Sequence, residues 1–415
     1  MDMRKRIIDF FKEAAFRTVA YAGTVFPSRQ RAALICPPAA APGSLGDEAM
    51  IKALVGELRK NGFSRLGILE TGSSTAWQEA TEVDAGVPAP SASLGGWLRF
   101  LRALKAYSHV YVIGADCIDG NYSVTGSRRL LRLADFCARA GRNTTITGCS
   151  FNASADPLII ETIDGLDRRV RLLARDPMSH SRITALTTHH AELVADLAFL
   201  LKPSPQHAAE TIDWIRRERA AGRTVLGVNL GASALGTKDR STILKCVDAF
   251  AHALGNRLET DAMLSIVLLP HDFRGESSDL AMCEKLHESL SSRFGARVRL
   301  FDEHVGASAI KAVAGELDAC VTCRMHLAIA CLGNGVPVGA VTYQDKFEGL
   351  FGHLGITPPV ISGMQATDAA AVAKLVDGTL AEAASIRKTL AGTLQRVRAL
   401  SERNVPFSNR QHATG

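Results

Sequence analysis

The sequence contains no run of the ~18–20 uninterrupted apolar residues that a membrane-spanning helix requires, which excludes an integral helical membrane protein. Lys12 and Glu13 interrupt an apolar stretch near the start before it reaches signal-peptide length, and no small-residue cleavage site follows. We therefore expect a cytoplasmic protein.

Other common signals are also missing. The nine cysteines are scattered singly apart from Cys320 and Cys323, so we expect reduced thiols and no disulfide framework. The formal net charge is only +6 and residues 1–31 hold most of the surplus, which does not indicate a nucleic-acid groove. No G-x-G-x-x-G follows a first strand, which disfavours a dinucleotide oxidoreductase.

Residues 1–31 predict a basic amphipathic helix. Ile7 and Phe11 lie on one side of it, while Lys5 and Arg17 lie elsewhere. Such a helix can pack on a domain surface with its cations in solvent, or it can lie on anionic lipid. The second interpretation would add a peripheral contact with the inner face of the cytoplasmic membrane.

A length of 415 residues predicts two domains, because single cores stop growing at ~250–300 residues. From residue 33 onward, β-rich runs alternate with helical stretches, which predicts α/β domains with parallel sheets covered on both faces. Two Rossmann-like domains facing a cleft would bind ligands at the carboxyl ends of their strands. The expected strands cover residues 66–69, 110–113, 144–148, 171–174, 224–229, 263–269, 298–301, 319–322 and 336–341.

The expected domain boundary lies at the Pro-containing stretch 202–205, which interrupts this alternation. An Ala-rich stretch near the end has apolar residues at helical spacing and predicts a long terminal helix. The expected organisation is the helix at 1–31, an N-terminal Rossmann-like domain at 32–201, a linker at 202–207, a C-terminal Rossmann-like domain at 208–365 and a helical tail at 366–415.

Two loops in the first half carry carboxylates close to expected ligand positions. Gly46 lets the backbone approach a ligand, and Asp47 or Glu48 could face the cleft, although an acid there could equally cap the following helix. Asp116 and Asp119 follow the strand at 110–113, where they could hold a sugar hydroxyl or accept its proton. Ordinary turn chemistry also explains both residues.

Two further residues follow expected strands. Arg175 offers a fork of donors suited to phosphate or carboxylate, or it could form a salt bridge with a neighbouring acid such as Asp176. His271 ends the strand at 263–269 and could bind an acceptor sugar or cap the following turn. Both are candidate substrate-binding residues.

The densest cluster lies at 320–346. Arg324 and His326 come where a strand passes into a helix, and Lys346 follows the next strand, so a phosphorylated, carboxylated ligand would satisfy all of them. Cys320, Cys323 and His326 also have spacings that resemble zinc ligands, but a structural zinc site needs a fourth ligand and none is apparent. We therefore expect no metal.

At these residues the chain resembles the polysaccharide pyruvyl transferase family. In one respect it departs from that pattern, because Gly114-Ala115-Asp116-Cys117 replaces the glycine-rich turn of many members. The resemblance rests on Gly46-Asp47-Glu48-Ala49, Ala174-Arg175-Asp176, Asp196-Leu197-Ala198-Phe199, Leu269-Pro270-His271-Asp272, Arg324-Met325-His326, Gly335-Val336-Pro337 and Tyr343-Gln344-Asp345-Lys346.

The resemblance implies a fold similar to GT-B glycosyltransferases, with the acceptor side in the N-terminal domain and the donor side in the C-terminal domain. It implies phosphoenolpyruvate as donor substrate, no redox cofactor, and a sugar of an exopolysaccharide or its lipid-linked precursor as acceptor. The product would be a cyclic pyruvate ketal, with release of phosphate. A nucleotide-sugar-dependent glycosyltransferase and a non-catalytic binding protein on the same fold remain alternatives.

The residues suit that chemistry. His326 is the candidate general acid, because histidine readily exchanges protons near neutral pH, although it could instead only bind phosphate. Asp47, Asp116 or Asp119 could deprotonate the acceptor hydroxyl. Arg175, Arg324 and Lys346 are the expected ligands of the phosphate and carboxylate, with Gly46, Glu48 and His271 as further binding residues.

Overall fold

The computed structural model describes residues 31–71, 75–91, 93–237, 239–274, 278–301, 306–342 and 345–406. The helix expected at 1–31 and the end of the expected tail, residues 407–415, lie outside the described residues, apart from Arg31. Tyr343 and Gln344 of the last family motif also lie outside them.

The chain divides into two compact units. Unit 1 contains residues up to Pro42, Ile51–Leu197 and residues from Leu400, whereas unit 2 contains Gly43–Met50 and Ala198–Ala399. The division after Leu197 falls close to the linker expected at 202–207. Residues 43–50 lie in the range expected for the N-terminal domain, yet they pack with unit 2 because Ser44 pairs with Asp272 in an antiparallel bridge.

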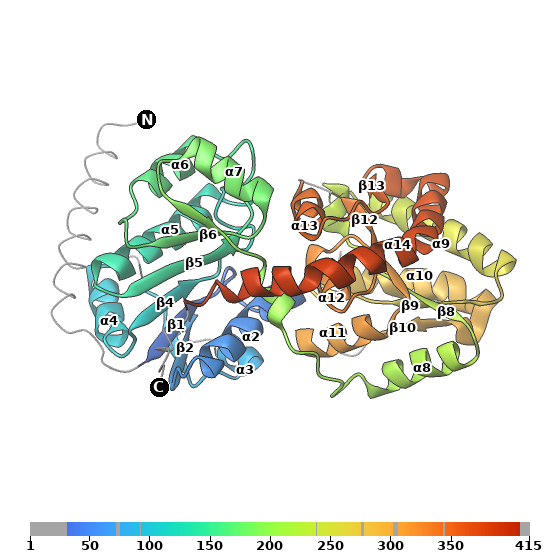
Figure 1. The fold of residues 1–415 in the computed structure, drawn as a ribbon, viewed down its shortest axis with the longest axis horizontal. Coiled ribbons are helices and arrows are strands. Elements are labelled where there is room, and N and C mark those ends of the chain that lie inside the picture. The colour runs from blue at the N-terminus through green and yellow to red at the C-terminus, as the bar shows by residue number, and fades with distance from the viewer. Residues whose placement is uncertain are drawn as a thin grey trace, which may run out of the picture. The chain divides into compact units, whose positions relative to one another are not determined.

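Unit 1 is built on a parallel sheet of seven strands in the order β3-β2-β1-β4-β5-β6-β7. Helices cover both faces of the sheet (Figure 1). Its strands are β1 (Ala32–Cys36), β2 (Arg65–Glu70), β3 (Ala85–Pro88), β4 (His109–Val112), β5 (Asn143–Cys149), β6 (Arg171–Ala174) and β7 (Ala191–Leu193). Its helices are α2 (Leu45–Lys60, which begins in unit 2), α3 (Ala76–Thr81), α4 (Leu94–Leu104), α5 (Val124–Arg139), α6 (Pro157–Asp164) and α7 (Pro177–Leu186).

Unit 2 repeats this plan with six parallel strands in the order β10-β9-β8-β11-β12-β13. Its strands are β8 (Thr224–Val228), β9 (Leu264–Leu268), β10 (Val298–Leu300), β11 (Ala319–Thr322), β12 (Val338–Thr342) and β13 (Val360–Ser362). Its α-helices are α8 (Ala209–Ala220), α9 (Arg240–Thr260), α10 (Asp279–Phe294), α11 (Ala307–Glu316), α12 (Met325–Gly333), α13 (Lys346–Leu354) and α14 (Ala369–Glu402). Short 3₁₀ turns are η2 (Leu197–Leu200, at the junction of the units), η3 (Ala232–Leu235), η4 (Gly295–Arg297) and η5 (Gln365–Thr367).

The two strand orders confirm the expected parallel α/β architecture. In each unit the order reverses beside the first strand, between β1 and β4 in unit 1 and between β8 and β11 in unit 2. In doubly wound sheets, ligands bind beyond the carboxyl ends of the strands at such a reversal. The loops after β1, β4, β8 and β11 are therefore where a site is expected.

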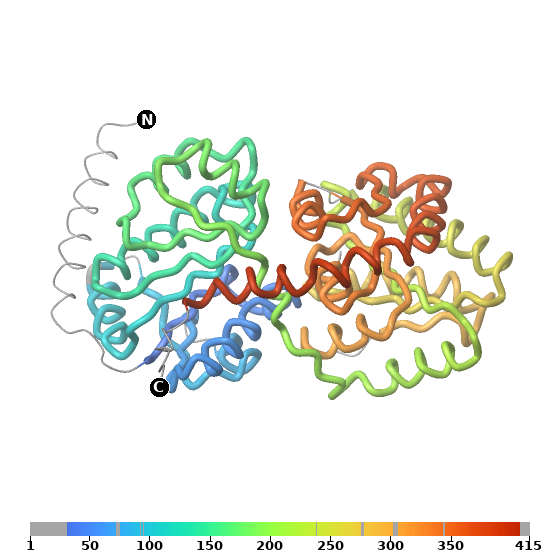
Figure 2. Tube along the Cα trace, viewed as in Figure 1, coloured from blue at the N-terminus to red at the C-terminus, as the bar shows by residue number. Residues whose placement is uncertain are grey.

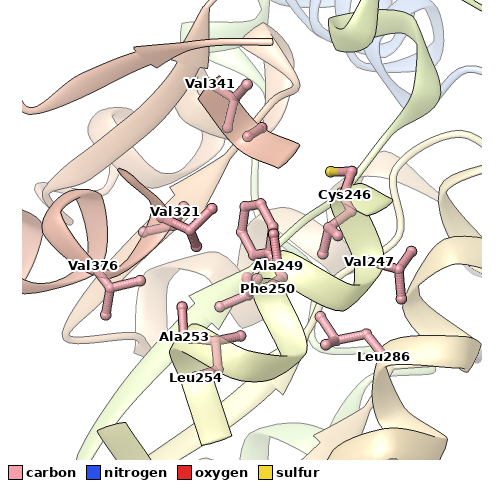
Figure 3. Packing of buried hydrophobic residues seen from close by; sticks show 14 of the residues in the cluster. Cys246, Val247, Ala249, Phe250, Ala253, Leu254, Leu286, Val321, Val341 and Val376 are labelled. Atoms are coloured by element: carbon pink, nitrogen blue, oxygen red, sulfur yellow. The ribbon is translucent and has the colours of Figure 1, made fainter. Parts of the chain in front are cut away.

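The core of unit 2 packs its helices against the strands of its sheet. Figure 3 shows Phe250 and Leu254 of α9 packed with Leu286 of α10, Val321 of β11 and Val376 of α14. Phe250 is 1% exposed and Leu254 is fully buried. Burying a side chain of this size stabilises the fold by ~1.5–3 kcal/mol.

The long terminal helix expected from the sequence is α14, which Figure 2 traces as one continuous coil. Its apolar stripe is buried at Ile386, Leu390 and Val397, and its last residues belong to unit 1. Neither α14 nor any other helix in the described ranges is both long and apolar enough to cross a membrane.

Candidate active site

Asp279, the first residue of α10, connects three segments at the carboxyl edge of the unit 2 sheet. Its carboxylate accepts hydrogen bonds from Nε and Nη2 of Arg324 at 3.0 and 2.6 Å, after β11. It also accepts from Nδ2 of Asn229 at 3.0 Å, after β8, and from the backbone N–H of His271 at 3.2 Å, after β9. Because Asp279 is fully buried, these contacts fix the loops of neighbouring strands together at the β8/β11 reversal.

The Asp279–Arg324 pair is a buried ion pair. Burial raises the pKa of Asp279, and the Arg324 guanidinium opposes that rise. Burial also disfavours the charge of Arg324, but the Asp279 carboxylate outweighs this cost and raises the pKa of the guanidinium. Arg324 therefore stays charged, in one fixed orientation, directly before α12.

His326 lies in the first turn of α12 and is partly exposed. A Cβ added to Gly46 would lie 2.7 Å from its Cγ, so the Gly46 backbone lies directly against the imidazole. The segment that carries Gly46 is held in place by backbone hydrogen bonds from Leu45 N–H to the His271 carbonyl and from Phe273 N–H to the Gly43 carbonyl, both 3.3 Å. The glycine predicted to allow close approach thus does so, toward a histidine.

His271 is buried beside this pair. Burial, with the nearby His326 and Arg324, lowers the pKa of His271 to about 3. It is therefore neutral at physiological pH. His271 is only 3% exposed. This burial leaves little of the imidazole accessible to an acceptor sugar, the ligand predicted for His271.

A second ion pair lies at the rim of the site. Arg274 donates to Asp272 through Nε at 3.0 Å and Nη2 at 2.7 Å, and Nη1 of Arg324 lies 3.5 Å from the same carboxylate. Asp47, in the first turn of α2, adds to the rise in the pKa of Arg274 that Asp272 mainly causes. Asp47 is partly exposed, so it is the acid of the Gly46 loop that can meet a ligand.

Glu48 and Lys346 occupy other positions on this edge. Oε1 of Glu48 accepts a hydrogen bond from the backbone N–H of Ala307 at 3.0 Å and so holds the first turn of α11, which is not the following helix α2 that an acid here was expected to cap. Lys346 is the first residue of α13 and is buried. Since β12 neighbours β11, α12 and α13 start at the same edge of the sheet.

Arg175 lies in unit 1 and forms an ion pair and a hydrogen bond within that unit. Its Nη1 donates to Asp196 at 3.0 Å and its Nε to Ser150 at 2.9 Å, and both side chains of the ion pair are 3% exposed. Asp176, the acid expected to pair with it, instead caps α7 through the backbone N–H of Ser179. The salt-bridge interpretation therefore describes Arg175, with Asp196 as partner, and Arg324 likewise lies in an ion pair.

The two candidate aspartates in the turn after β4 differ in exposure and in hydrogen bonding. Asp119 is buried and accepts backbone hydrogen bonds from Asn121 at 3.0 Å and Asn152 at 3.2 Å, as turn chemistry predicts. Asp116 is partly exposed, accepts from the hydroxyl of Tyr122 at 3.1 Å, and adds to the raised pKa of Arg175. Of the two, Asp116 is the one open to a ligand.

A cavity of about 240 Å³ lies at the carboxyl edge of the unit 1 sheet. Its wall comes from the loop after β1, the ends of β2 and β3, the β4 turn and α5, so it occupies the β1/β4 reversal. Pro37, Pro38 and Leu130 make it largely apolar, and Tyr122, which is 57% exposed, lies at its wall. Such a surface suits the apolar face of a sugar ring or aglycone.

A comparison with protein families shows to which family the chain belongs. A family model described as polysaccharide pyruvyl transferase matches residues 45–345. The chain belongs to the polysaccharide pyruvyl transferase family. The matched range starts at the Gly46 loop, includes Arg324 and His326, and ends one residue before Lys346. No curated protein sequence matches the chain significantly.

Several solved structures share the fold of this chain. The HepE protein of Anabaena, solved with UDP-glucose, is 14% identical with a TM-score of 0.52, over 90% of this chain and 98% of that one. MnaA of S. aureus, solved with UDP, is 10% identical with a TM-score of 0.57, over 88% and 91%. A UDP-GlcNAc 2-epimerase of Methanocaldococcus jannaschii is 11% identical with a TM-score of 0.52, over 85% and 93%. At such low sequence identities, these structures show only that the chain has a GT-B-like fold.

Two residues of this site were not found from the sequence. Asp279 looks like an ordinary acid in a first helical turn, and its partner Arg324 lies 45 residues away. Asn229 gave a weak signal, as a polar residue directly after the apolar run of β8. Its Oδ1 accepts from Cys323 at 3.2 Å, and in the described part of the chain no group of three or more His, Cys, Asp or Glu residues could hold a metal ion.

Proposed function

We propose that the protein transfers pyruvate from phosphoenolpyruvate to a sugar of a cell-surface polysaccharide, or of its lipid-linked precursor, forming a cyclic ketal and releasing phosphate. The family match supports transferase chemistry in polysaccharide synthesis. The observation that carries the proposal is the Arg324–His326 pair at the start of α12, at the β8/β11 reversal of unit 2. It combines an anion site with a side chain that can donate a proton.

Unit 2 is the proposed donor-binding unit. The first N–H groups of α12 point toward an anion, and the helix dipole favours negative charge there. Arg324, held in place by Asp279, presents fixed N–H donors there, although the Asp279 carboxylate offsets its charge, and Lys346 at the start of α13 adds a positive charge. Phosphoenolpyruvate carries a phosphate and a carboxylate, so it needs several such groups.

In the proposed reaction His326 protonates the vinyl carbon of the donor, and C2 accepts a sugar hydroxyl. Phosphate then leaves C2, and a second hydroxyl of the same acceptor closes the ketal. His326 takes up the proton of one hydroxyl and so regains the proton that it gave to the new methyl group. The proton of the other hydroxyl leaves with phosphate. No redox cofactor is needed, because no electrons are gained or lost overall.

Unit 1 is the proposed acceptor-binding unit. Its 240 Å³ cavity offers an apolar wall for a sugar or its aglycone, and Asp116 and Tyr122 provide hydrogen-bonding groups at that edge. Asp116 is the proposed base in unit 1 and Asp47 the proposed base in unit 2, since both are partly exposed. Asp119 is the weaker candidate because its carboxylate holds the turn.

The second candidate is a nucleotide-sugar-dependent glycosyltransferase. The Anabaena protein with UDP-glucose favours it, because a helix start with nearby cations suits a diphosphate as well. Ligand protection separates the two functions. Under our proposal phosphoenolpyruvate raises the unfolding temperature and UDP-sugars do not.

Phosphate release completes the test. The protein is incubated with phosphoenolpyruvate and a panel of lipid-linked or aryl glycosides, and the products are identified by mass. We expect acceptor-dependent phosphate release and a ketal product. Release of a nucleoside diphosphate from a sugar donor would favour the second candidate, and no release with any acceptor would favour a binding protein.

A further inference from the structure

A second cavity, of about 360 Å³, lies in unit 1 at the opposite edge of the sheet. Arg31 precedes β1, and His109, Asn143 and Arg171 open β4, β5 and β6, so these lining residues mark the amino ends of the strands. The proposed acceptor cavity lies at the carboxyl ends. The two are therefore separate, and the proposed pyruvyl transfer does not use this one.

Polar side chains lie in register across three strands below this cavity. Tyr111 of β4 is paired with Thr145 of β5, which is paired with Arg171 of β6, and paired residues of neighbouring strands share a sheet face. His109, two residues before Tyr111, lies on the same face, and the two rings stack with centroids 6.4 Å apart. A polar row of this kind is unusual on the inner face of a parallel sheet, which is normally apolar.

Two donors in this row are buried without a hydrogen-bond partner among the described residues: the Tyr111 hydroxyl and Nη1 of Arg171. Tyr111 is 1% exposed. The remaining guanidinium nitrogens of Arg171 hold Glu192, with Nε at 3.0 Å and Nη2 at 2.9 Å. Buried polar groups are nearly always satisfied, so donors left over in this way indicate an acceptor that binds there.

The cavity wall is also positively charged. Arg31 donates to the carbonyl of Asn61 at 2.8 Å, and no carboxylate in the described ranges forms an ion pair with it. Arg169, at the same wall, is held by Asp167 at 2.8 Å. Phe63 and Pro406 supply apolar surface beside these groups. An anion with an organic portion would match both parts of the wall.

We propose that this cavity binds a phosphate-bearing small molecule or headgroup, whose phosphate accepts hydrogen bonds from Arg31 and Nη1 of Arg171. The cavity falls within the range of ~300–1,000 Å³ typical of small-molecule sites, which exceeds the needs of a bare phosphate. The organic portion would lie against Phe63 and Pro406. The same chemistry describes a free phosphate ester and the headgroup of an anionic lipid.

Thermal unfolding tests the site with inorganic phosphate and glycerol 3-phosphate as probes. We expect glycerol 3-phosphate to raise the unfolding temperature of the wild type and of His326→Ala, which lacks the proposed proton donor. Arg31→Gln and Arg171→Lys should weaken that binding about tenfold or more, since each loses a charge-assisted hydrogen bond. Arg171→Lys keeps a positive charge beside Glu192, so it should still fold.

Arg168→Gln is the matched control, because Arg168 is exposed and does not line the cavity. Protection by phosphoenolpyruvate should persist in Arg171→Lys, so failure here is distinguishable from failure of the proposed transfer. Equal responses to glycerol 3-phosphate in the wild type, Arg31→Gln and Arg171→Lys would overturn the proposal. So would no response in the wild type together with no vesicle binding.

Vesicle flotation separates the two sources of phosphate. If the ligand is a lipid headgroup, the wild type floats with phosphatidylglycerol vesicles but not with phosphatidylcholine, and Arg31→Gln and Arg171→Lys reduce flotation while Arg168→Gln does not. If it is a free ester, glycerol 3-phosphate binds and these variants float like the wild type.

Discussion

The backbone of Gly46 lies directly against the imidazole of His326, so that a Cβ at this position would lie 2.7 Å from Cγ of the ring. A loop at the start of α2 thus sets the position of the residue proposed to deliver the proton.

Gly46→Ala should therefore abolish transfer while leaving the fold intact. The added methyl group displaces the imidazole, and misplacing a catalytic group by about 1 Å costs roughly 100-fold in rate. Gly56→Ala is the matched control in the same helix, because a Cβ there meets nothing within 4 Å and alanine favours a helix over glycine. Steady-state phosphate release and thermal unfolding of both variants check this. Normal transfer by Gly46→Ala would show that the ring position does not matter.

Asp279→Asn should weaken both the fold and donor binding. Removing the carboxylate leaves the largely buried Arg324 charge with only Asp272, at 3.5 Å, as an acidic partner, which costs up to ~3–5 kcal/mol of unfolding free energy. It also frees the Arg324 fork, so the KM for phosphoenolpyruvate should rise. Urea unfolding and donor-dependent kinetics measure the two effects.

The exposed pair between Arg293 and Glu259 supplies the control. Glu259→Gln should change the free energy of unfolding by no more than ~1 kcal/mol and leave the KM unchanged. An Asp279→Asn protein as stable as Glu259→Gln would contradict a buried ion pair at this site.

Arg175→Gln should destabilise unit 1, because it leaves the carboxylate of Asp196 buried without its partner. We expect a loss of ~3–5 kcal/mol in chemical unfolding, whereas Arg216→Gln, which breaks an exposed pair with Glu316, should unfold almost like the wild type. If Arg175→Gln is as stable as the wild type and loses only donor binding, Arg175 is the anion clamp that the sequence suggested.

His271 makes stability depend on pH. Its pKa in the folded protein is about 3, mainly because of burial, whereas an unfolded histidine titrates near ~6.5. Between these two pH values His271 is protonated in the unfolded chain but not in the folded protein. The free energy of unfolding is therefore highest above pH ~6.5 and falls as the pH drops toward 3. Urea unfolding of His271→Gln should lack a fall of up to ~1.4 kcal/mol per pH unit that the wild type shows. Parallel curves for the two proteins would mean that His271 is accessible to protons when folded.

Ala115→Gly should be neutral or stabilising by up to ~1 kcal/mol. Ala115 has φ of 46°, a left-handed conformation that costs a residue with a Cβ ~1–2 kcal/mol, and the greater freedom of unfolded glycine offsets part of the gain. Gly114→Ala should act in the opposite direction, because its Cβ would lie 2.8 Å from Cβ of Cys149. Calorimetric unfolding of the two variants checks both signs.

Much of the fold could be predicted because hydrophobic runs mark the central strands. Runs such as β8 and β9 are mostly apolar and almost entirely buried, and every strand expected from the sequence is present. The expectation did not include β1, β3, β7 and β13. The last three form sheet edges and are only three or four residues long, and β3 contains glycine and proline, so they carry little hydrophobic signal. β1 is a central, fully buried strand of five residues, and edge position does not explain why it was missed.

The candidate site could be predicted only in part. Arg324 and His326 could be predicted because they directly follow a strand, and the strand order determines the edge of the sheet at which that loop lies. The partner of a charged residue does not follow from it, so the sequence showed neither Asp279 beside Arg324 nor Asp196 beside Arg175. The crossing of residues 43–50 into unit 2 depends on a pairing with residues more than two hundred positions away, for which the local sequence holds no signal.

Phosphate release from phosphoenolpyruvate in the presence of a glycan acceptor, compared between the wild type, His326→Ala and Lys346→Ala, tests the proposed donor site most directly. We predict acceptor-dependent release and a ketal product for the wild type, and loss of both in the two variants with unchanged circular dichroism. Wild-type rates of release by His326→Ala would contradict the account.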